Sequence, residues 1–435
     1  ECHGWLAAKP GQEIQGLVSL DGPFGHGPPV QTCRTSLNDW RDYSNAAFGE
    51  PRWMANVILP SIRFEPPGIT QKSRRSAVLE QFKVSHGDAI FAQSDALRRT
   101  VTEIFEKMGV TLEDSQLAAD VLVLADLRGV DSHGVSNMLR TYVKNYQDGE
   151  INPRPNWKII RETPSTATID SDRGHGIIMT PKAMDIAIKK AREVGVGMVA
   201  IGNARHLGMA SYHAMRALDH DMIGVCMTSC PPSMLPTFGA EPRLGTNPIS
   251  FAVPAGSEPP FVYDAATSSV AVNKIRIAAR LGVDIPGGWL ADEQGNPIME
   301  AAPAPEIVRT LPLGSNRELG SHKGYGLACV VDILAGVLTG FGWGVAPGRP
   351  NFGHYVAAYS VDAFTDVGKF KDDMDEWLRM MKATRPAPGH DRVLVAGQPE
   401  AEVEAVRREE GIPLHPEVAE SLREICGQLA VTSPV

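Results

Sequence analysis

The fold of this chain is decided by one short stretch, Gly195-Val196-Gly197-Met198-Val199-Ala200. It matches the GxGxxA string of Rossmann domains, in which a strand comes first and a helix follows, so that a phosphate meets the helix N-terminus. Here the order is reversed, because a helical apolar pattern leads up to Gly195 and residues 198–201 read as a buried strand. The sequence therefore predicts an α/β protein without a Rossmann fold.

Two helices are predicted well before this stretch. Ser94 can cap the first, which Gly109 closes, and Thr111 with Asp114 opens the second. The second helix stops at Gly129, which leaves the residues that follow on a loop at its C-terminal end.

The other predicted elements are short. Thr180-Pro181 is expected to start the helix that ends at Gly195, since proline suits the first helical position. The rest are strands at residues 166–169, 222–228, 251–253, 261–263 and 393–395, a helix at 209–218, and a mainly helical region from residue 372.

Composition narrows the class of protein. The 435 residues carry a net charge of −9 and no basic run, which argues against a nucleic-acid surface. Six scattered cysteines without a CxxC pair do not suggest a disulfide framework, and no histidine stands at ligand spacing from Cys226 and Cys230, so no metal site is expected. This cysteine usage fits a cytoplasmic location, and no signal peptide is visible.

An apolar run at residues 326–346 is long enough to cross a bilayer. Asp332 lies inside it and glycines crowd its end. We therefore expect a buried helix of about 15 residues, followed by a glycine-rich loop, rather than a membrane span.

Five short signatures, rich in glycine and in titratable residues, follow one another between residues 131 and 326. They are Asp131-Ser132-His133-Gly134, Asn203-Ala204-Arg205-His206-Leu207-Gly208, Gly245-Thr246-Asn247-Pro248, Asp264-Ala265-Ala266-Thr267 and His322-Lys323-Gly324-Tyr325-Gly326. Glycines let a cofactor approach the backbone, a histidine moves a substrate proton, and a lysine meets phosphate or carboxylate charge. These are the residue types that hydride-transfer chemistry needs.

The series resembles the malate/L-lactate dehydrogenase family of NAD(P)-dependent oxidoreductases, which includes ureidoglycolate and sulfolactate dehydrogenases and cyclic-imine reductases. The resemblance covers about residues 94 to 425. It implies a mixed, largely antiparallel sheet domain beside a helical domain built from N- and C-terminal parts. It also implies NAD or NADP as cofactor, a small-molecule substrate, and a homodimer or a higher even-numbered oligomer.

Three regions follow from this reading. Residues 1–88, rich in proline and glycine, are an N-terminal extension of unknown role. Residues 89–165 form the helical domain, to which residues 347–435 return. Residues 166–346 form the central α/β cofactor-binding domain.

His133 lies on a predicted loop between Ser132 and Gly134. A neutral imidazole suits the removal of a hydroxyl proton as hydride leaves the same carbon. The tetrapeptide alone is more typical of a surface or capping histidine. The resemblance, however, implies that His133 is catalytic and that Ser132 hydrogen-bonds the substrate or the imidazole.

His206 competes for the same role. With Asn203 it follows a predicted strand, at the end where ligands often bind in α/β proteins, and Gly208 permits close backbone approach. The resemblance implies that the matching histidine transfers a proton in some members and lies beside the cofactor. We interpret His133 as the general acid/base and His206 as a cofactor-site residue.

The substrate-binding position departs from the family pattern. Many members carry an arginine four residues after the catalytic histidine to hold a substrate carboxylate, whereas this chain has Asn137. Arg140, one turn further, could bind a carboxylate bidentately, although a surface charge is an equally good interpretation. Asn137 and Arg140 are the candidate substrate-binding residues.

Further candidates for the cofactor site follow two strands. Thr228 and Ser229 end a strand and present hydroxyl groups. Asp264-Ala265-Ala266-Thr267 resembles the family's Asp-Met-Ala-Thr motif, with Ala265 in place of methionine. Asp264 could orient a histidine or accept a hydrogen bond from the nicotinamide amide, although an aspartate at a strand-end turn is common.

His322, Lys323 and Gly324 precede the long apolar helix. A lysine near a helix N-terminus, with glycines beside it, suits a pyrophosphate or a carboxylate. A lone Lys-Gly pair is usually a surface turn, and the other signatures raise this one to a candidate cofactor-binding set.

Together these observations predict an NAD(P)-dependent oxidoreductase that passes a hydride between nicotinamide and a small 2-hydroxy acid or 2-keto acid. One alternative is a cyclic-imine reductase of the same family. The other is a non-catalytic binding or assembly protein on this scaffold, which Asn137 and the N-terminal extension would favour.

Overall fold

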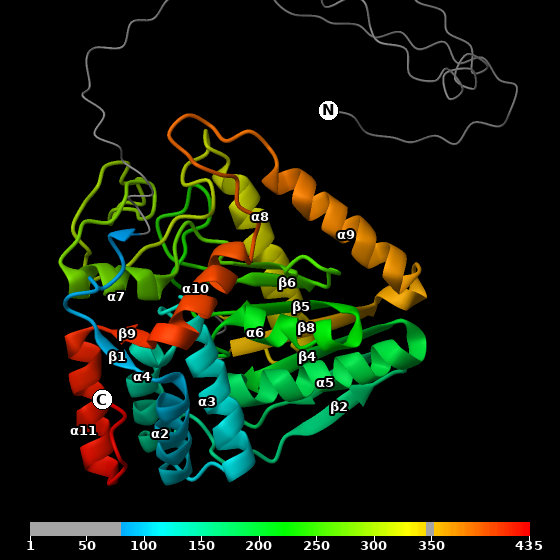
Figure 1. Cartoon of the computed structure of the whole chain (residues 1–435), viewed down its shortest axis with the longest axis horizontal. Coiled ribbons are helices and arrows are strands. Elements are labelled where there is room, and N and C mark those ends of the chain that lie inside the picture. The colour runs from blue at the N-terminus through cyan, green and yellow to red at the C-terminus, as the bar shows by residue number, and fades with distance from the viewer. Residues whose placement is uncertain (1–79, 345–351) are drawn as a thin grey trace, which may run out of the picture. The chain divides into compact units, whose positions relative to one another are not determined.

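The computed structural model describes residues 80–344 and 352–435, and a seven-stranded sheet lies at its centre (Figure 1). In spatial order the strands are β2 (Lys158–Glu162), β3 (Thr166–Asp170), β4 (Val196–Ala204), β8 (Phe352–Ser360), β5 (Met222–Ser229), β6 (Ile249–Val253) and β7 (Phe261–Ala265). β3 and β4 run parallel, and the other neighbouring pairs are antiparallel. The mixed, largely antiparallel sheet confirms the predicted fold class and differs from the parallel sheet of a Rossmann domain.

Helices cover both faces of this sheet. α5 (Gly176–Val194) and α6 (Ala210–Met215) pack on one face. α8 (Ser321–Val331) and the π-helical turn η3 (Asp332–Gly336) pack on the other. The central strands are therefore buried on both sides, and this removes most of their apolar surface from water.

The stretch that resembles a Rossmann glycine loop has a structural explanation. Gly195 ends α5 in the left-handed conformation, with φ 87°, which favours glycine. Gly197 in β4 lies against α5, and a Cβ there would overlap the carbonyl oxygen of Ala187. Both glycines therefore serve a tight helix-to-strand connection rather than the approach of a phosphate.

A second core lies among helices. α2 (Ser94–Lys107), α3 (Leu112–Leu127), α4 (Val135–Gln147) and α11 (Pro416–Leu429) lie side by side (Figure 1), and their buried residues form one cluster. β1 (Ile90–Ala92) pairs antiparallel with β9 (Ile412–Leu414), which joins the N- and C-terminal parts of this domain.

The predicted starts of two of these helices differ in accuracy. Thr111 caps α3 as expected, since its side chain accepts a hydrogen bond from the backbone N–H of Asp114. α2 begins at Ser94 itself, and Gln93 occupies the N-cap position without a side-chain bond. The predicted boundary was therefore one residue late.

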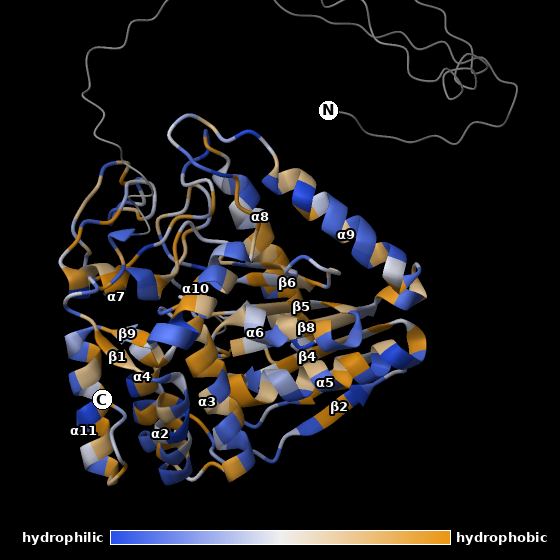
Figure 2. Ribbon diagram, in the orientation of Figure 1, coloured by the Kyte–Doolittle hydropathy of each residue, from blue (hydrophilic) through white to orange (hydrophobic). Residues whose placement is uncertain are grey.

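The C-terminal part of the chain is shared between the two cores. β8 lies in the middle of the sheet, so the expectation that residues 347–435 return to the helical domain is wrong for this strand. β2 likewise joins the sheet, although it lies within residues 89–165. α10 (Gln398–Glu410) contacts α3, and the mainly hydrophilic α9 (Val367–Lys382) lies outside that bundle (Figures 1 and 2). The predicted strand at residues 393–395 is not formed.

A smaller core surrounds α7 (Val272–Leu281). Phe82 stacks on Trp289 there, with ring centroids 5.5 Å apart. The last part of the predicted N-terminal extension therefore packs on the folded chain, while the extension up to residue 79 lies outside the described residues.

Two expectations about helices are wrong. α5 begins at Gly176 rather than at Thr180, because Ile177, Ile178 and Met179 are buried and extend the helix ahead of Pro181. The apolar run from residue 326 is not a wholly buried helix either. It continues from α8 through η3 into a 3₁₀ turn, η4 (Val337–Thr339), and one side of it faces solvent.

The exposed residues on that side are Leu327, Val330, Ile333, Val337 and Leu338. The first four recur every three or four positions and Leu338 follows directly, so they form one apolar stripe. No helix within residues 80–344 and 352–435 is long and apolar enough to span a membrane.

Candidate active site

A cavity of about 170 Å³ brings several of the signatures together. Its walls come from the loop after α3, the start of α6, the end of β7 and α10. Six residues named from the sequence line it: Ser132, His133, Gly208, Asp264, Ala265 and Ala266. These residues are far apart in the chain, and the fold places them around one space.

His133 lies in the cavity wall on the loop that joins α3 to α4. Its Nδ1 is 2.8 Å from the Ser132 hydroxyl oxygen. Burial lowers the pKa of His133 to about 4, so the ring is neutral at physiological pH. A neutral imidazole facing a cavity can accept a proton.

His206 stacks beside His133, with ring centroids 5.6 Å apart and an interplanar angle of 15°. Its Nδ1 lies 2.6 Å from the Tyr142 hydroxyl, and the backbone N–H of Gly208 donates to the same nitrogen over 3.3 Å. Burial, and next the charge of His133, hold the pKa of His206 well below its usual range. His206 is thus a neutral ring fixed behind His133.

The loop that carries His133 rests on a buried carboxyl group. A Cβ on Gly134 would overlap the carboxylate of Asp126, so only glycine fits at this position of the signature. The backbone N–H of Ser136 donates to Asp126 over 3.3 Å. Burial, and next the charge of Asp131, raise the pKa of Asp126 to about 8, so this group is mostly protonated at neutral pH.

Asp264 lies at the end of β7, opposite the start of α6. Its carboxylate accepts a hydrogen bond from the backbone N–H of Ser211 over 2.6 Å. Part of the surface of Asp264 faces the cavity, and the surrounding protein covers the rest. This burial is the main cause that raises the pKa of Asp264 to about 6. The group is therefore largely ionised at pH 7 and can accept a further hydrogen bond.

Sequence reasoning missed two charged residues of the cavity, Arg128 and Glu400. The Arg128 side chain is only 8% exposed and pairs with Glu404 over 2.9 Å, yet its Nε has no hydrogen-bond partner among the described residues. The one hint of Arg128 in the sequence was its position, since it is a cation directly before Gly129, where the predicted helix stops. Glu400 lies on α10, and its position in the sequence gave no sign of contact with the signatures.

Three predicted residues at strand ends are bonded within the protein, and the cavity does not include them. Asn203 donates to Asp170 over 2.9 Å. Thr228 bonds the Gly353 carbonyl and His354, and Ser229 bonds Asp332. Their hydroxyl and amide groups connect strands and η3.

The two candidate substrate-binding residues also lie elsewhere. Asn137 donates its amide to the carbonyl of Asp131 over 2.6 Å, which braces the loop. Arg140 is exposed and pairs with Glu424 over 2.6 Å. Both line a different cavity, between α4 and α11, because they lie on the face of α4 opposite Tyr142.

The signature at residues 245–248 contributes to the cavity of His133, whereas the signature at residues 322–326 lies outside it. Thr246 and Pro248 line the cavity, although neither was named as a site residue. His322 and Lys323 are exposed in the first turn of α8, and His322 bonds Arg317 over 3.0 Å. Gly324 is buried, and a Cβ there would overlap the backbone of Leu313.

Solved structures with this fold include two malate dehydrogenases. The malate dehydrogenase of Pyrococcus horikoshii OT3 gives a TM-score of 0.75 at 35% identity, over 81% of this chain and 98% of that chain. The malate dehydrogenase of Entamoeba histolytica gives 0.76 at 31% identity, over 80% and 100%. The delta1-piperideine-2-carboxylate reductase of Pseudomonas syringae, at 23% identity and a TM-score of 0.64, shares the fold.

Sequence relatives define the family. The malate dehydrogenase of Pyrococcus abyssi is 39% identical over 343 residues, which is 78% of this chain and 94% of that protein. The L-sulfolactate dehydrogenase of Methanocaldococcus jannaschii is 37% identical over 340 residues, or 77% and 96%. The chain is thus an oxidoreductase that acts on CH–OH groups. Residues 92–423 match the malate/L-lactate dehydrogenase family model, and the chain belongs to that family.

Proposed function

We propose that this protein is an NAD(P)-dependent dehydrogenase of a small 2-hydroxy acid such as malate, working also on the matching 2-keto acid. The observation that carries the proposal is the neutral His133 in a cavity that also holds a buried arginine, Arg128. The relatives named for malate and sulfolactate support an acid as substrate.

The cavity residues fit a nicotinamide ring. Small apolar side chains of Ala210, Ala265, Ala266 and Ala271 line the cavity beside His133. Asp264 can accept a hydrogen bond from a carboxamide N–H, since its carboxylate is largely ionised at pH 7. When bound, the nicotinamide of either NAD or NADP accepts the two electrons and the hydrogen that leave the substrate carbon.

His133 takes the hydroxyl proton in this mechanism. The Ser132 hydroxyl, 2.8 Å from Nδ1, can accept the ring proton there and leave Nε2 free as the base. A bound carboxylate close to the ring would raise the pKa of His133 from about 4 toward neutrality, because an opposite charge favours the imidazolium. The same residue then returns the proton when a keto acid is reduced.

Arg128 holds the substrate carboxylate. It lines the cavity, it is almost fully buried, and its Nε lacks a partner among the described residues. A guanidinium binds a carboxylate through two parallel hydrogen bonds. Arg128 would thus supply the cation that Asn137 does not.

Lys323 is proposed as a contact of the cofactor phosphates. It is exposed in the first turn of α8, next to the bonded pair of Arg317 and His322. A helix N-terminus with cations beside it favours an anion.

A homodimer is proposed from the apolar stripe on α8, η3 and η4. The exposed Leu327, Val330 and Ile333 follow one side of the helix, and the C-terminal half of α8 is hydrophobic in Figure 2. Contiguous exposed apolar surface of this kind marks association sites. A cytoplasmic location is the matching proposal, since the cysteines of the described residues are free.

The experiment is an absorbance assay with NADH or NADPH and with oxaloacetate, pyruvate or piperideine-2-carboxylate. Turnover of a 2-keto acid supports the proposal. Turnover of the imine alone would favour the cyclic-imine reductase. No turnover with any pair, together with no cofactor protection against heat, would contradict a dehydrogenase.

A further inference from the structure

A second cavity, of about 190 Å³, lies between α4, α7 and α11. It shares none of its lining residues with the cavity of His133. Its volume is well above the ~10–15 Å³ that a single water needs. A small molecule can therefore occupy it without displacing anything from the proposed active site.

The lining of this second cavity is cationic. Three arginines contribute to it, Arg140 from α4 and Arg276 and Arg280 from α7, against a single carboxylate, Glu417. Arg140 has its own partner outside the lining, Glu424. Among the described residues Arg276 bonds the neutral side-chain oxygen of Asn273, over 3.1 Å, and no carboxylate there pairs with it.

Arg280 is the strongest indication of a missing ligand. Its side chain is 18% exposed, and its Nε is buried without a hydrogen-bond partner among the described residues. The nearest carboxylate oxygen, on the largely exposed Glu417, is 3.5 Å away. The ion pair between Arg280 and Glu417 is therefore too long for a good hydrogen bond, and a closer anion would stabilise this guanidinium.

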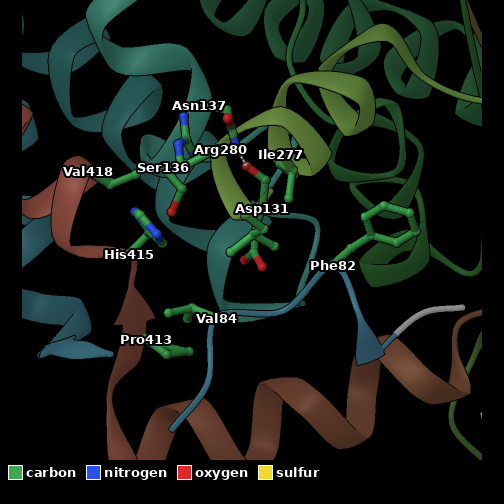
Figure 3. A pocket seen from close by; sticks show the side chains of 11 residues that line it. Phe82, Val84, Asp131, Ser136, Asn137, Ile277, Arg280, Pro413, His415 and Val418 are labelled. Atoms are coloured by element: carbon green, nitrogen blue, oxygen red, sulfur yellow. Dashed lines mark hydrogen bonds between the residues drawn. The ribbon is translucent and has the colours of Figure 1, made fainter. Parts of the chain in front are cut away.

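Arg280 also lies where two cavities meet. Figure 3 shows it beside Ser136 and Asn137, in the wall of a smaller cavity that adjoins the one between α4 and α11. The hydroxyl of Ser136 can donate to a ligand oxygen there. The smaller cavity is also lined by the carboxylate of Asp131, which pairs with Arg407. The cavity between α4 and α11 itself offers both charged and neutral donors around one space.

We propose that this cavity binds a small oxyanion with two negative charges, either an inorganic phosphate or a dicarboxylate. Planar guanidinium groups match the oxygen geometry of both. The site adjoins the catalytic loop, because Arg276 bonds Asn273, which in turn donates to the backbone carbonyl of Ser132 over 2.8 Å. The proposal does not depend on the dehydrogenase activity.

Calorimetric titration of the whole protein with phosphate, and separately with succinate, tests this proposal. Sodium chloride at matched ionic strength is the reference. The variants are Arg280→Gln and the exposed Arg276→Gln, and the control is Arg161→Gln on the exposed strand β2. Losing one charge-assisted bond should weaken binding about tenfold or more in each variant and leave the control unchanged.

The relative affinities for phosphate and succinate identify which source of the oxyanion the site prefers. Arg128→Gln separates this site from the proposed active site: phosphate binding should stay intact, and any part of the succinate binding that is lost belongs to the active site. No binding beyond that of chloride in the wild-type protein would overturn the proposal. Equal binding in the wild-type protein and in Arg276→Gln and Arg280→Gln would overturn it as well, and Arg276→Gln decides if Arg280→Gln does not fold.

Discussion

Tyr142 donates its hydroxyl hydrogen to Nδ1 of His206 over 2.6 Å. The direction of this bond follows from the backbone N–H of Gly208, which donates to the same nitrogen and requires it to be an acceptor. His206 therefore carries its ring proton on Nε2 and has no free acceptor nitrogen. His133, which lies in the cavity wall, is the better candidate for the base.

Replacing Tyr142 with phenylalanine keeps the ring and removes this bond. We expect the free energy of unfolding to fall by about 1 kcal/mol. We also expect kcat to fall roughly tenfold, because His206 loses its fixed orientation beside His133, while KM changes little. Chemical unfolding and steady-state kinetics measure the two effects.

The matched control is Tyr146→Phe, which removes a similar bond to His175. It should cost comparable stability and leave kcat nearly unchanged, since the ring that stacks on His133 is that of His206 and not that of His175. Equal kcat values for the two variants would mean that Tyr142 has only a structural role.

Stability should fall as the pH drops from 7 to 5. Burial lowers the pKa values of four histidines below 6.5, to about 4 for His133 and His354 and about 3 for His175 and His213. Each is neutral in the folded protein and protonated in the unfolded chain below pH 6.5. Their contribution to the free energy of unfolding is therefore complete above pH 6.5. It is lost toward pH 4, at about 1.4 kcal/mol for each histidine and each pH unit.

Three carboxyl groups act in the opposite direction, among them Asp332, whose pKa burial also raises. The pKa values of Asp126 and Asp264 are raised by burial, so these groups favour folding at lower pH. The histidines outnumber them. Urea unfolding at pH 7 and pH 5 should show a net loss of several kcal/mol at the lower pH, and equal stability would contradict the buried neutral histidines.

Arg128→Gln should raise KM for the acid substrate roughly tenfold or more, because a charge-assisted pair with the carboxylate is lost. The control is Arg408→Gln, since Arg408 pairs with the same Glu404 but is exposed and does not line the cavity. Steady-state kinetics of both variants gives the answer. A KM unchanged in Arg128→Gln would remove this residue from substrate binding.

A charge on the apolar stripe should break the proposed dimer. Ile333→Asp places a carboxylate among exposed Leu327, Val330 and Val337, and burying it in an interface would be costly. Light scattering at low protein concentration should report a smaller particle than for the wild-type protein. Ile160→Asp on β2 also changes an exposed isoleucine and should leave the mass unchanged. A wild-type monomer would contradict the dimer itself.

The local features were predictable because their causes are local. Gly195 ends a helix in a conformation that favours glycine, and Thr111 caps the helix that follows it by accepting a nearby backbone N–H. The end of the one helix and the start of the other could therefore be predicted from neighbouring residues. His133 and Asp264 line one cavity, and the prediction of their roles depended on the resemblance to a family.

Long-range partners were not predictable in the same way. β8 is a nine-residue, mostly buried strand, and nothing in its residues says that it lies between β4 and β5. The apolar run that begins in α8 was expected to be buried. Apolar periodicity shows that a helix face is hydrophobic, but it does not reveal whether the surface that covers this face belongs to the same chain. Arg128 was missed since its role depends on a cavity that distant segments complete.

The central claim is that His133 exchanges the substrate proton. The most direct test is kcat for reduction of a 2-keto acid by His133→Ala, measured together with the Kd for the nicotinamide cofactor. We predict that kcat falls by roughly 100-fold or more while the Kd stays close to the wild-type value. Wild-type turnover in this variant would contradict the account and remove His133 from the mechanism.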